Sequence, residues 1–203
     1  MGVPCGRVVV LSGPSGVGKT TLVERLFQIC PLPLVRSVSA TTRLPRGAEV
    51  DGVDYHFVTA ERFQALRDEG QFLECCEVFS QGCWYGTLWN EVRAGIEAGK
   101  WVVLNIDVHG AAAVMERFAD AITIFVSLRS MEELRRRLEF RGTDRPEEIE
   151  RRLQRAQYEM GQAHRSGVFR YEVVNDNLDR AVKEICTLLT ENCIYRKEGE
   201  RAK

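Results

Sequence analysis

The chain has 203 residues, of which 44% are hydrophobic, and this length and composition suit a single globular domain. Its formal net charge of −1 and isoelectric point near 6.3 exclude a broad basic surface of the kind that binds nucleic acid. No apolar run approaches the roughly 20 residues that a membrane-spanning helix needs, so no membrane is expected as a partner either. The seven cysteines show no disulfide-type spacing, which indicates reduced thiols and a cytoplasmic location.

The first predicted element is an apolar strand at residues 7–12, which runs into the glycine-rich stretch GPSGVGKT and then into a helix-compatible run over 21–29. This order fits the P-loop pattern, in which glycines let backbone N–H groups surround phosphate oxygens. Lys19 adds a cation to the β- and γ-phosphates, and the hydroxyl of Thr20 is the expected Mg²⁺ ligand. The predicted triphosphate-binding residues are Gly13, Ser15, Gly16, Val17, Gly18, Lys19, Thr20 and Thr21.

The P-loop pattern leaves the use of the triphosphate open. Switches, motors and small-molecule kinases all begin with this motif, and a glycine-rich turn without any ligand is the remaining alternative. A second anion site, for an acceptor, would indicate a kinase.

The stretch SATTRLPRG, residues 39–47, supplies candidates for such a site. Pro45 disfavours helical geometry at Leu44, so Arg43 and Arg46 are expected on an irregular loop. This loop follows the second predicted strand, 34–38, whose carboxyl end is expected near the P-loop. Two guanidinium groups there suit a second phosphate, and Tyr55 can add a hydroxyl. The alternative for this fragment alone is a pair of solvated surface arginines.

The remaining elements alternate between strands and helices, which predicts an α/β fold with a parallel sheet covered on both faces. Residues 39–90 interrupt this alternation with turn signals, and we expect an inserted segment with mixed or antiparallel pairing. Residues 141–148, RGTDRPEE, form a second irregular patch between two charged helices. The predicted strands are 55–58, 72–79, 101–106, 121–128 and 171–174, and helical patterns cover 60–69, 131–138 and 178–189.

The segment SVSATTRLPRGAEVDGVDYHFV resembles the nucleoside-monophosphate-binding segment of guanylate kinases, and FLE, YGT, NIDVHG, RGTDRPEEIERRL and VVNDNLD follow in that family's order. The resemblance implies the P-loop nucleoside-monophosphate kinase fold as one domain over 1–203. Its core would be 1–38, 91–137 and 153–203, its GMP-binding insertion 39–90 and its lid 138–152. It also implies transfer of the γ-phosphate of ATP to GMP, and to dGMP, with Mg²⁺ and without an obligate protein partner.

The same resemblance assigns roles residue by residue. It places the acceptor phosphate on Arg43, Arg46, Tyr55 and Tyr85, and guanine on Ser39, Glu74, Thr87 and Asp107. It places ATP on Arg137, Asn175 and Asp176, and catalysis on Lys19, Arg46, Arg141 and Arg152. An ionised Glu74 can accept hydrogen bonds from both N1–H and the 2-amino group of guanine, whereas adenine lacks these donors. Asp107 is also expected to cap a helix that begins near Val108.

Two residues depart from the family pattern. Asn105 stands where the family usually has an acid, and His109 where it usually has glutamine. The main rival is a protein-interaction module that keeps this fold without catalysis, and such modules have degraded P-loops, unlike this chain. The second rival is a P-loop kinase for another small acceptor.

Overall fold

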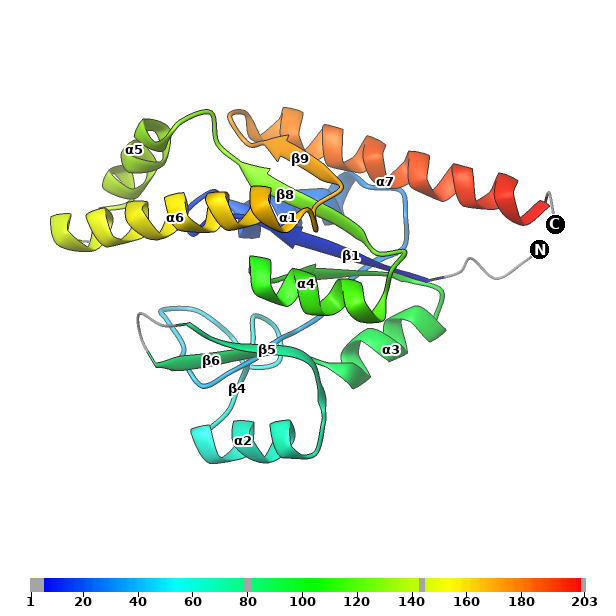
Figure 1. Ribbon diagram of the computed structural model, residues 1–203, viewed down its shortest axis with the longest axis horizontal. Coiled ribbons are helices and arrows are strands. Elements are labelled where there is room, and N and C mark those ends of the chain that lie inside the picture. The colour runs from blue at the N-terminus through cyan, green and yellow to red at the C-terminus, as the bar shows by residue number, and fades with distance from the viewer. Residues whose placement is uncertain (1–5, 79–81, 143–144, 202–203) are drawn as a thin grey trace. The chain divides into compact units, whose positions relative to one another are not determined.

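Figure 1 shows the computed structural model, which describes residues 6–78, 82–142 and 145–201; for residues 78, 141 and 194–201 only the backbone is described. Contacts between residues divide the chain into two compact units. The first unit contains residues 1–10 and 33–121, and the second contains residues 11–32 and 122–203. The expected core, insertion over 39–90 and lid over 138–152 have other boundaries than these two units. This partition stays a prediction.

A five-stranded sheet has the strand order β2-β7-β1-β8-β9, and its neighbours β2 and β7, and β8 and β9, pair in parallel. All residues of β8 are buried, as expected for a strand rich in β-branched residues and covered on both faces. The predicted α/β class with a parallel sheet is confirmed. The bounds are β1 Arg7–Ser12, β2 Leu34–Arg36, β7 Trp101–Asn105, β8 Ile122–Ser127 and β9 Tyr171–Val174.

The first unit also holds a four-stranded sheet of order β4-β3-β6-β5. Here β3 pairs in parallel with β4 and antiparallel with β6, and β5 pairs antiparallel with β6, so the expectation of mixed pairing is confirmed. Helix α2 lies against this sheet (Figure 1), and its Phe63 stacks on Phe72 of β5 with ring centroids 4.5 Å apart. The bounds are β3 Ala40–Thr41, β4 His56–Phe57, α2 Ala60–Asp68, β5 Phe72–Val78, β6 Cys83–Leu88, α3 Trp89–Glu97 and α4 Val108–Arg117.

In the described part of the second unit, β8 and β9 are accompanied by the helices α1, α5, α6 and α7. Helix α1 packs against α7, and α5 packs against α6. The irregular patch expected over 141–148 overlaps the two flanking helices, since α5 extends to Arg141 and α6 begins at Pro146, whose fixed φ suits a first helical position. Residues 143–144 of this patch lie outside the described residues. The bounds are α1 Lys19–Ile29, α5 Met131–Arg141, α6 Pro146–Ser166 and α7 Leu178–Arg201. Over the described ranges, no helix combines the length and apolarity needed to cross a membrane.

Candidate active site

The loop after β1 turns into α1 through glycines with backbone angles that other residues avoid. Gly13, Gly16 and Gly18 have φ values of +150°, +88° and +95°. A Cβ at Gly13 would lie 2.3 Å from the carbonyl oxygen of Val126, so a side chain there would collide with β8. The N-cap of α1 is Gly18, which has no side chain to bond to the first N–H groups of the helix. These N–H groups and the positive end of the helix dipole are therefore suited to an anion.

Lys19 ties the start of α1 to the beginning of the loop. Its Nζ donates hydrogen bonds to the carbonyl oxygens of Gly13 at 2.5 Å and Pro14 at 3.1 Å. Ser15, Thr20 and Thr21 are exposed on the same segment. The ammonium group is thus held at the loop by its backbone carbonyls, where a lysine can also reach phosphate oxygens.

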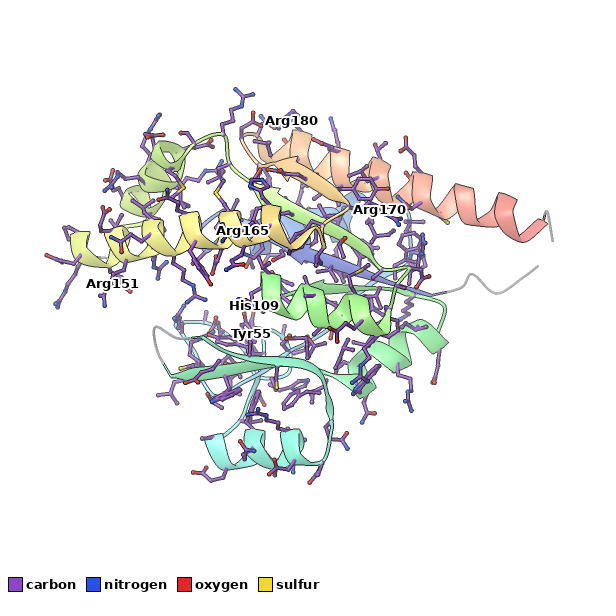
Figure 2. The ribbon with its side chains drawn as sticks, viewed as in Figure 1. Tyr55, His109, Arg151, Arg165, Arg170 and Arg180 are labelled. Carbon is purple, nitrogen blue, oxygen red and sulfur yellow. The ribbon has the colours of Figure 1, made fainter. Side chains whose placement is uncertain are left out.

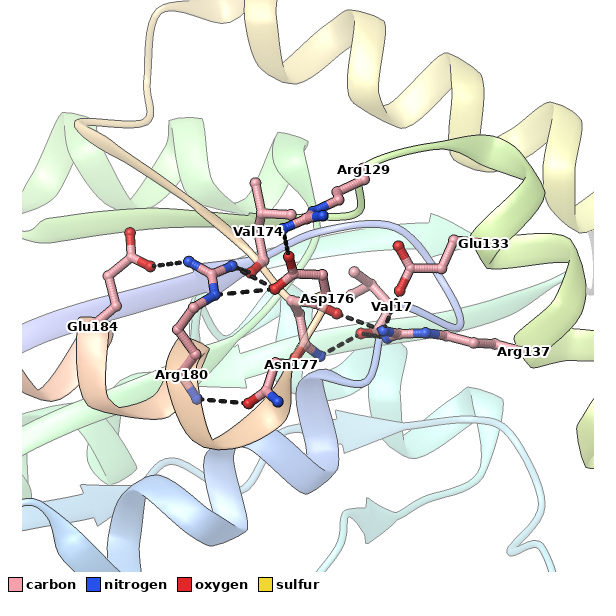
Figure 3. A network of polar contacts seen from close by, with 10 residues as sticks. Val17, Arg129, Glu133, Arg137, Val174, Asp176, Asn177, Arg180 and Glu184 are labelled. Carbon is pink, nitrogen blue, oxygen red and sulfur yellow. Dashed lines mark hydrogen bonds and ion pairs between the residues drawn. The ribbon is translucent and has the colours of Figure 1, made fainter.

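Two residues predicted to bind ATP, Arg137 and Asn175, donate to the carbonyl oxygen of Val17, and Figure 3 shows Arg137 at this position. Asn175 is buried and donates through Nδ2 to this oxygen at 2.8 Å, while Arg137 donates through Nη1 at 3.2 Å. Arg137 also bonds to the Glu133 carboxylate at 2.6 Å and to the carbonyl oxygen of Asn175 at 2.5 Å. The structure therefore places both side chains at the P-loop backbone, where they fix the loop's conformation.

Asp176 lies in an ionic network next to these hydrogen bonds (Figure 3). It forms ion pairs with Arg129 and with Arg180, whose Nη2 is 2.6 Å from the carboxylate. The hydrogen bond from Arg180 lowers the pKa of Asp176, so the carboxylate is ionised at neutral pH. The charge of Asp176 therefore connects the segment between β9 and α7 to Arg129 and to Arg180 of α7.

The predicted lid arginines are only partly placed. Arg152, on α6, lies 3.9 Å from the Glu148 carboxylate, one turn earlier on the same helix. The side chain of Arg141 lies outside the described residues. The catalytic roles of both arginines stay predictions.

In the first unit, Arg43 is buried and held by several partners. Its Nη1 and Nη2 donate to the two carboxylate oxygens of Glu49 at 2.8 and 2.9 Å, and its Nε donates to the Tyr85 hydroxyl at 3.1 Å. The guanidinium also lies 5.4 Å from the ring centroid of Tyr55. Three of the four residues predicted for the acceptor phosphate are thus in one cluster.

The two tyrosines of this cluster lie with ring centroids 5.8 Å apart, and Figure 2 labels Tyr55. Burial raises the pKa of the Tyr55 hydroxyl above its ordinary value, and the negative form of Tyr85 would raise it further. The Tyr55 hydroxyl is therefore protonated and available as a hydrogen-bond donor. The fourth residue, Arg46, has an exposed side chain, and its backbone N–H donates to Glu49 Oε2 at 2.7 Å.

Glu49 was not predicted as a site residue, although it holds both arginines of the loop. The signal for it is present in the sequence: an acid three residues after Arg46, on the same short turn. The hydrogen bond from Arg43 lowers the pKa of Glu49. Glu49 is therefore an ionised partner that orients the guanidinium group of Arg43.

We expect Glu49→Gln to lower the free energy of unfolding at pH 7 by about 1.5–3 kcal/mol, the range for a hydrogen bond to a charged group. Because the folded-state pKa of Glu49 is depressed, its stabilisation is present above the ordinary glutamate pKa and is lost as the pH falls through the folded-state value. Thermal unfolding at pH 7 and pH 4 would check this: the difference in stability between wild type and Glu49→Gln is expected to be smaller at pH 4 than at pH 7. Glu69→Gln, at an exposed glutamate of the same unit, serves as the control. A gap that is equal at both pH values would contradict the assignment.

Glu74 is a buried carboxylate on β5, 8% exposed. Its Oε1 accepts hydrogen bonds from the Thr87 hydroxyl at 2.5 Å and the Thr87 N–H at 3.1 Å. Burial and, to a lesser degree, the negative charge of Asp107 raise the pKa of Glu74 to about 7, against the lowering effect of the hydrogen bonds from Thr87. Three of the four predicted guanine residues thus interact: Glu74 accepts hydrogen bonds from Thr87 and is affected by the charge of Asp107.

Asp107 caps α4, as the sequence predicts. Its Oδ1 accepts from the N–H of Gly110 at 2.8 Å. A Cβ at position 110 would lie 2.8 Å from Glu74 Oε2, so only glycine leaves room for this carboxylate. Gly110 was missed because the sequence shows a glycine in a helix, without the neighbour that requires it. For Ser39 the structure records a backbone bond, from the N–H of His56 to its carbonyl oxygen at 2.9 Å.

Comparisons with known proteins concern the chain as a whole. The sequence model of the guanylate kinase family matches residues 5–192. The guanylate kinase of Rhodopirellula baltica is 49% identical over 187 residues, which are 92% of this chain and 88% of that protein. The guanylate kinase of Mycolicibacterium paratuberculosis is 50% identical over 184 residues, which are 91% of this chain and 81% of that protein.

A solved structure has a similar fold. The crystal structure of guanylate kinase from Anaplasma phagocytophilum aligns with a TM-score of 0.75 at 31% identity, covering 93% of this chain and 86% of that one. With a family match over most of its length and relatives near half identity, the chain belongs to the guanylate kinase family.

Proposed function

We propose that this protein transfers the γ-phosphate of ATP to GMP, giving ADP and GDP, and accepts dGMP in the same site. The observation that carries the proposal is the buried carboxylate of Glu74, bonded through Oε1 to Thr87. A carboxylate in this setting accepts the adjacent N1–H and 2-amino donors of guanine, and it would leave an adenine base without matching groups. Recognition of guanine is what separates this reaction from that of other P-loop kinases.

ATP is the donor in this proposal. Its phosphates bind the N–H groups of the loop and the start of α1, with Lys19 on the β- and γ-phosphates. Arg137 and Asn175 support the loop by donating hydrogen bonds to Val17. Asp176 belongs to the segment that lies near the adenine base of ATP.

The family also implies Mg²⁺, and the chemistry of the loop fits it. The exposed hydroxyl of Thr20 is a hard oxygen ligand of the kind that Mg²⁺ accepts. Among the described residues, no group of three His, Cys, Asp or Glu side chains is arranged for a metal. Such a site suits an ion held by one hydroxyl, water and nucleotide phosphates, and the bound ion would neutralise phosphate charge.

GMP is the acceptor. Arg43, Arg46, Tyr55 and Tyr85 bind its phosphate, and Ser39, Glu74, Thr87 and Asp107 bind guanine. In the chemical step, an oxygen of the GMP phosphate bonds to the γ-phosphorus as the bond from that phosphorus to the β–γ bridging oxygen breaks. Positive charge from Lys19, Arg46, Arg141 and Arg152 stabilises the negative charge on the migrating group.

The cellular setting is part of the same proposal. The six described cysteines are free thiols, which supports the cytoplasm as the site of action. The substrates are small molecules, and the reaction requires neither a nucleic acid nor a second protein. We place GMP binding in residues 39–90 and the lid in residues 138–152.

The proposal is tested by product analysis. Incubation of the purified protein with ATP, Mg²⁺ and GMP, followed by chromatography, is expected to give ADP and GDP in equal amounts. ATP without GMP is expected to give neither. ADP formation at the same rate with and without GMP would show a hydrolase and overturn the proposal.

We expect Arg46→Ala to reduce kcat/KM for GMP by a factor that corresponds to about 1.5–3 kcal/mol, because a charge-assisted phosphate contact is lost. Steady-state kinetics with GMP varied at saturating ATP would measure this. Arg62→Ala removes an exposed arginine of α2 in the same unit and is expected to behave as wild type. An unchanged kcat/KM for Arg46→Ala would show that Arg46 is a solvated surface residue without a role in GMP binding.

A further inference from the structure

Strand β5 places two cysteines on opposite faces. Side chains alternate along a strand, so Cys76 shares a face with Glu74, two residues earlier, while Cys75 points to the other face. In the register with β6, Cys76 lies opposite Tyr85 and Cys75 lies opposite Gly86. Cys76 therefore lies on the face of β5 that carries the guanine-binding carboxylate.

Cys76 contacts a second residue assigned to guanine. Its Sγ donates a hydrogen bond to Oδ2 of Asp107 at 3.1 Å. The other oxygen of this carboxylate, Oδ1, accepts from the N–H of Gly110 at 2.8 Å. With one donor from β5 and one from α4, which packs against β5, both oxygens of Asp107 are fixed. The thiol thus helps to determine the orientation of the carboxylate.

The chemistry of this contact favours a neutral donor. Glu74 and Asp107 are two carboxylates on one side of β5, and the charge of Asp107 already raises the pKa of Glu74. An S–H group can bond to Asp107 without adding a cation that would bind the carboxylates in place of guanine. An alanine would leave Oδ2 without this donor.

A reactive role for this thiol is disfavoured by its surroundings. Burial raises the pKa of Cys76 above its ordinary value, and the negative charge of Asp107 raises it further. The thiol is therefore protonated at neutral pH, so that it can donate, and it is a poor nucleophile.

We infer that Cys76 is a positioning residue for the acceptor base: by donating to Oδ2 of Asp107, its thiol holds this carboxylate in the orientation that binds guanine. This inference rests on the proposed function. It predicts an effect on GMP, with ATP use unchanged, because its partners belong to the guanine site of the first unit.

The test compares variants that remove or keep the donor. Cys76→Ala and Cys76→Val lack it at different side-chain volumes, and each is expected to raise KM for GMP about three- to tenfold, with kcat and KM for ATP near wild type. Cys76→Ser keeps a hydroxyl donor and is expected to restore KM for GMP to within about twofold of wild type. Cys75→Ala, the adjacent cysteine on the opposite face, is the matched control and is expected to leave KM for GMP unchanged.

GMP binding by calorimetry, without ATP, provides a readout that does not depend on turnover. A wild-type KM for GMP in Cys76→Ala, or a Cys76→Ser variant as impaired as Cys76→Ala, would overturn the inference. If Cys76→Ala or Cys76→Val fails to fold, the other one still provides the non-donor for comparison with Cys76→Ser. If Cys76→Ser fails to fold, the two non-donor variants are compared with the wild-type thiol. Absence of GMP turnover in the wild type would instead contradict the proposed function, so the two failures are distinguishable.

Discussion

Lys19→Ala is expected to lower kcat about 10²–10³-fold, the loss typical of removing one preorganised charge from a transition state. The lysine adds a cation to the phosphates between which the bond breaks, and phosphoryl transfer depends mainly on positioning and charge neutralisation. Its bonds to the carbonyl oxygens of Gly13 and Pro14 show that the structure holds the ammonium group at the loop. Steady-state kinetics at saturating ATP and GMP would measure the loss.

The control for this prediction is Lys183→Ala, at an exposed lysine of α7, for which we expect wild-type kcat. Thermal unfolding of Lys19→Ala is the check that the fold is retained. A folded Lys19→Ala variant with more than about a tenth of wild-type kcat would exclude Lys19 from the chemical step.

Glu74→Gln is expected to reduce kcat/KM for GMP by about 10²-fold, because a site built for hydrogen bonds discriminates strongly when the partners no longer match. The amide of glutamine offers one acceptor and one donor group, and the donor faces the donors of guanine. Glu77→Gln, at an exposed glutamate of the same strand, is the matched control and is expected to be neutral. Equal kcat/KM values for Glu74→Gln and wild type would remove Glu74 from the guanine site.

The pKa of Glu74 gives this prediction a second readout. Because the pKa is raised to about 7, kcat/KM for GMP is expected to fall below pH 7 as the carboxylate gains a proton, and this component disappears in Glu74→Gln. The effect on stability has the opposite sign to that of Glu49. The folded protein binds the Glu74 proton more tightly than the unfolded chain does, so this group's contribution to stability falls as the pH rises from the ordinary glutamate pKa to about 7. Thermal unfolding at pH 5 and pH 8 would check this: the stability of Glu74→Gln relative to wild type is expected to be higher at pH 8 than at pH 5.

Elements with a strong local pattern were predicted from the sequence. The P-loop was found because its glycines and Lys19 follow an apolar strand, and α7 begins at Leu178 as its helical spacing indicates. Strands β3 and β6 were not predicted. β3 has two residues, and β6 contains Gly86, which is needed because a Cβ there would lie 2.7 Å from the ring of Phe72. Pairing with distant strands, which single-sequence patterns do not contain, forms both.

The candidate site divides in the same way. Motif resemblance predicts Arg43 and Glu74 as site residues, and the structure places each of them among polar partners. The resemblance did not identify the carboxylate of Glu49 on Arg43, or the thiol of Cys76 on Asp107, because both are contacts between side chains that only the folded chain brings together. A free cysteine in a strand is usually a small apolar residue, so the sequence alone gives it no role.

The central claim is that the acceptor is recognised through guanine. It is tested most directly by kcat/KM of the wild-type enzyme for GMP, AMP and dTMP, measured at saturating ATP and Mg²⁺. We predict that GMP is preferred over AMP and over dTMP by at least about 10³-fold, because the buried Glu74 is matched only by the donors of guanine. Comparable kcat/KM for AMP or dTMP would contradict this account.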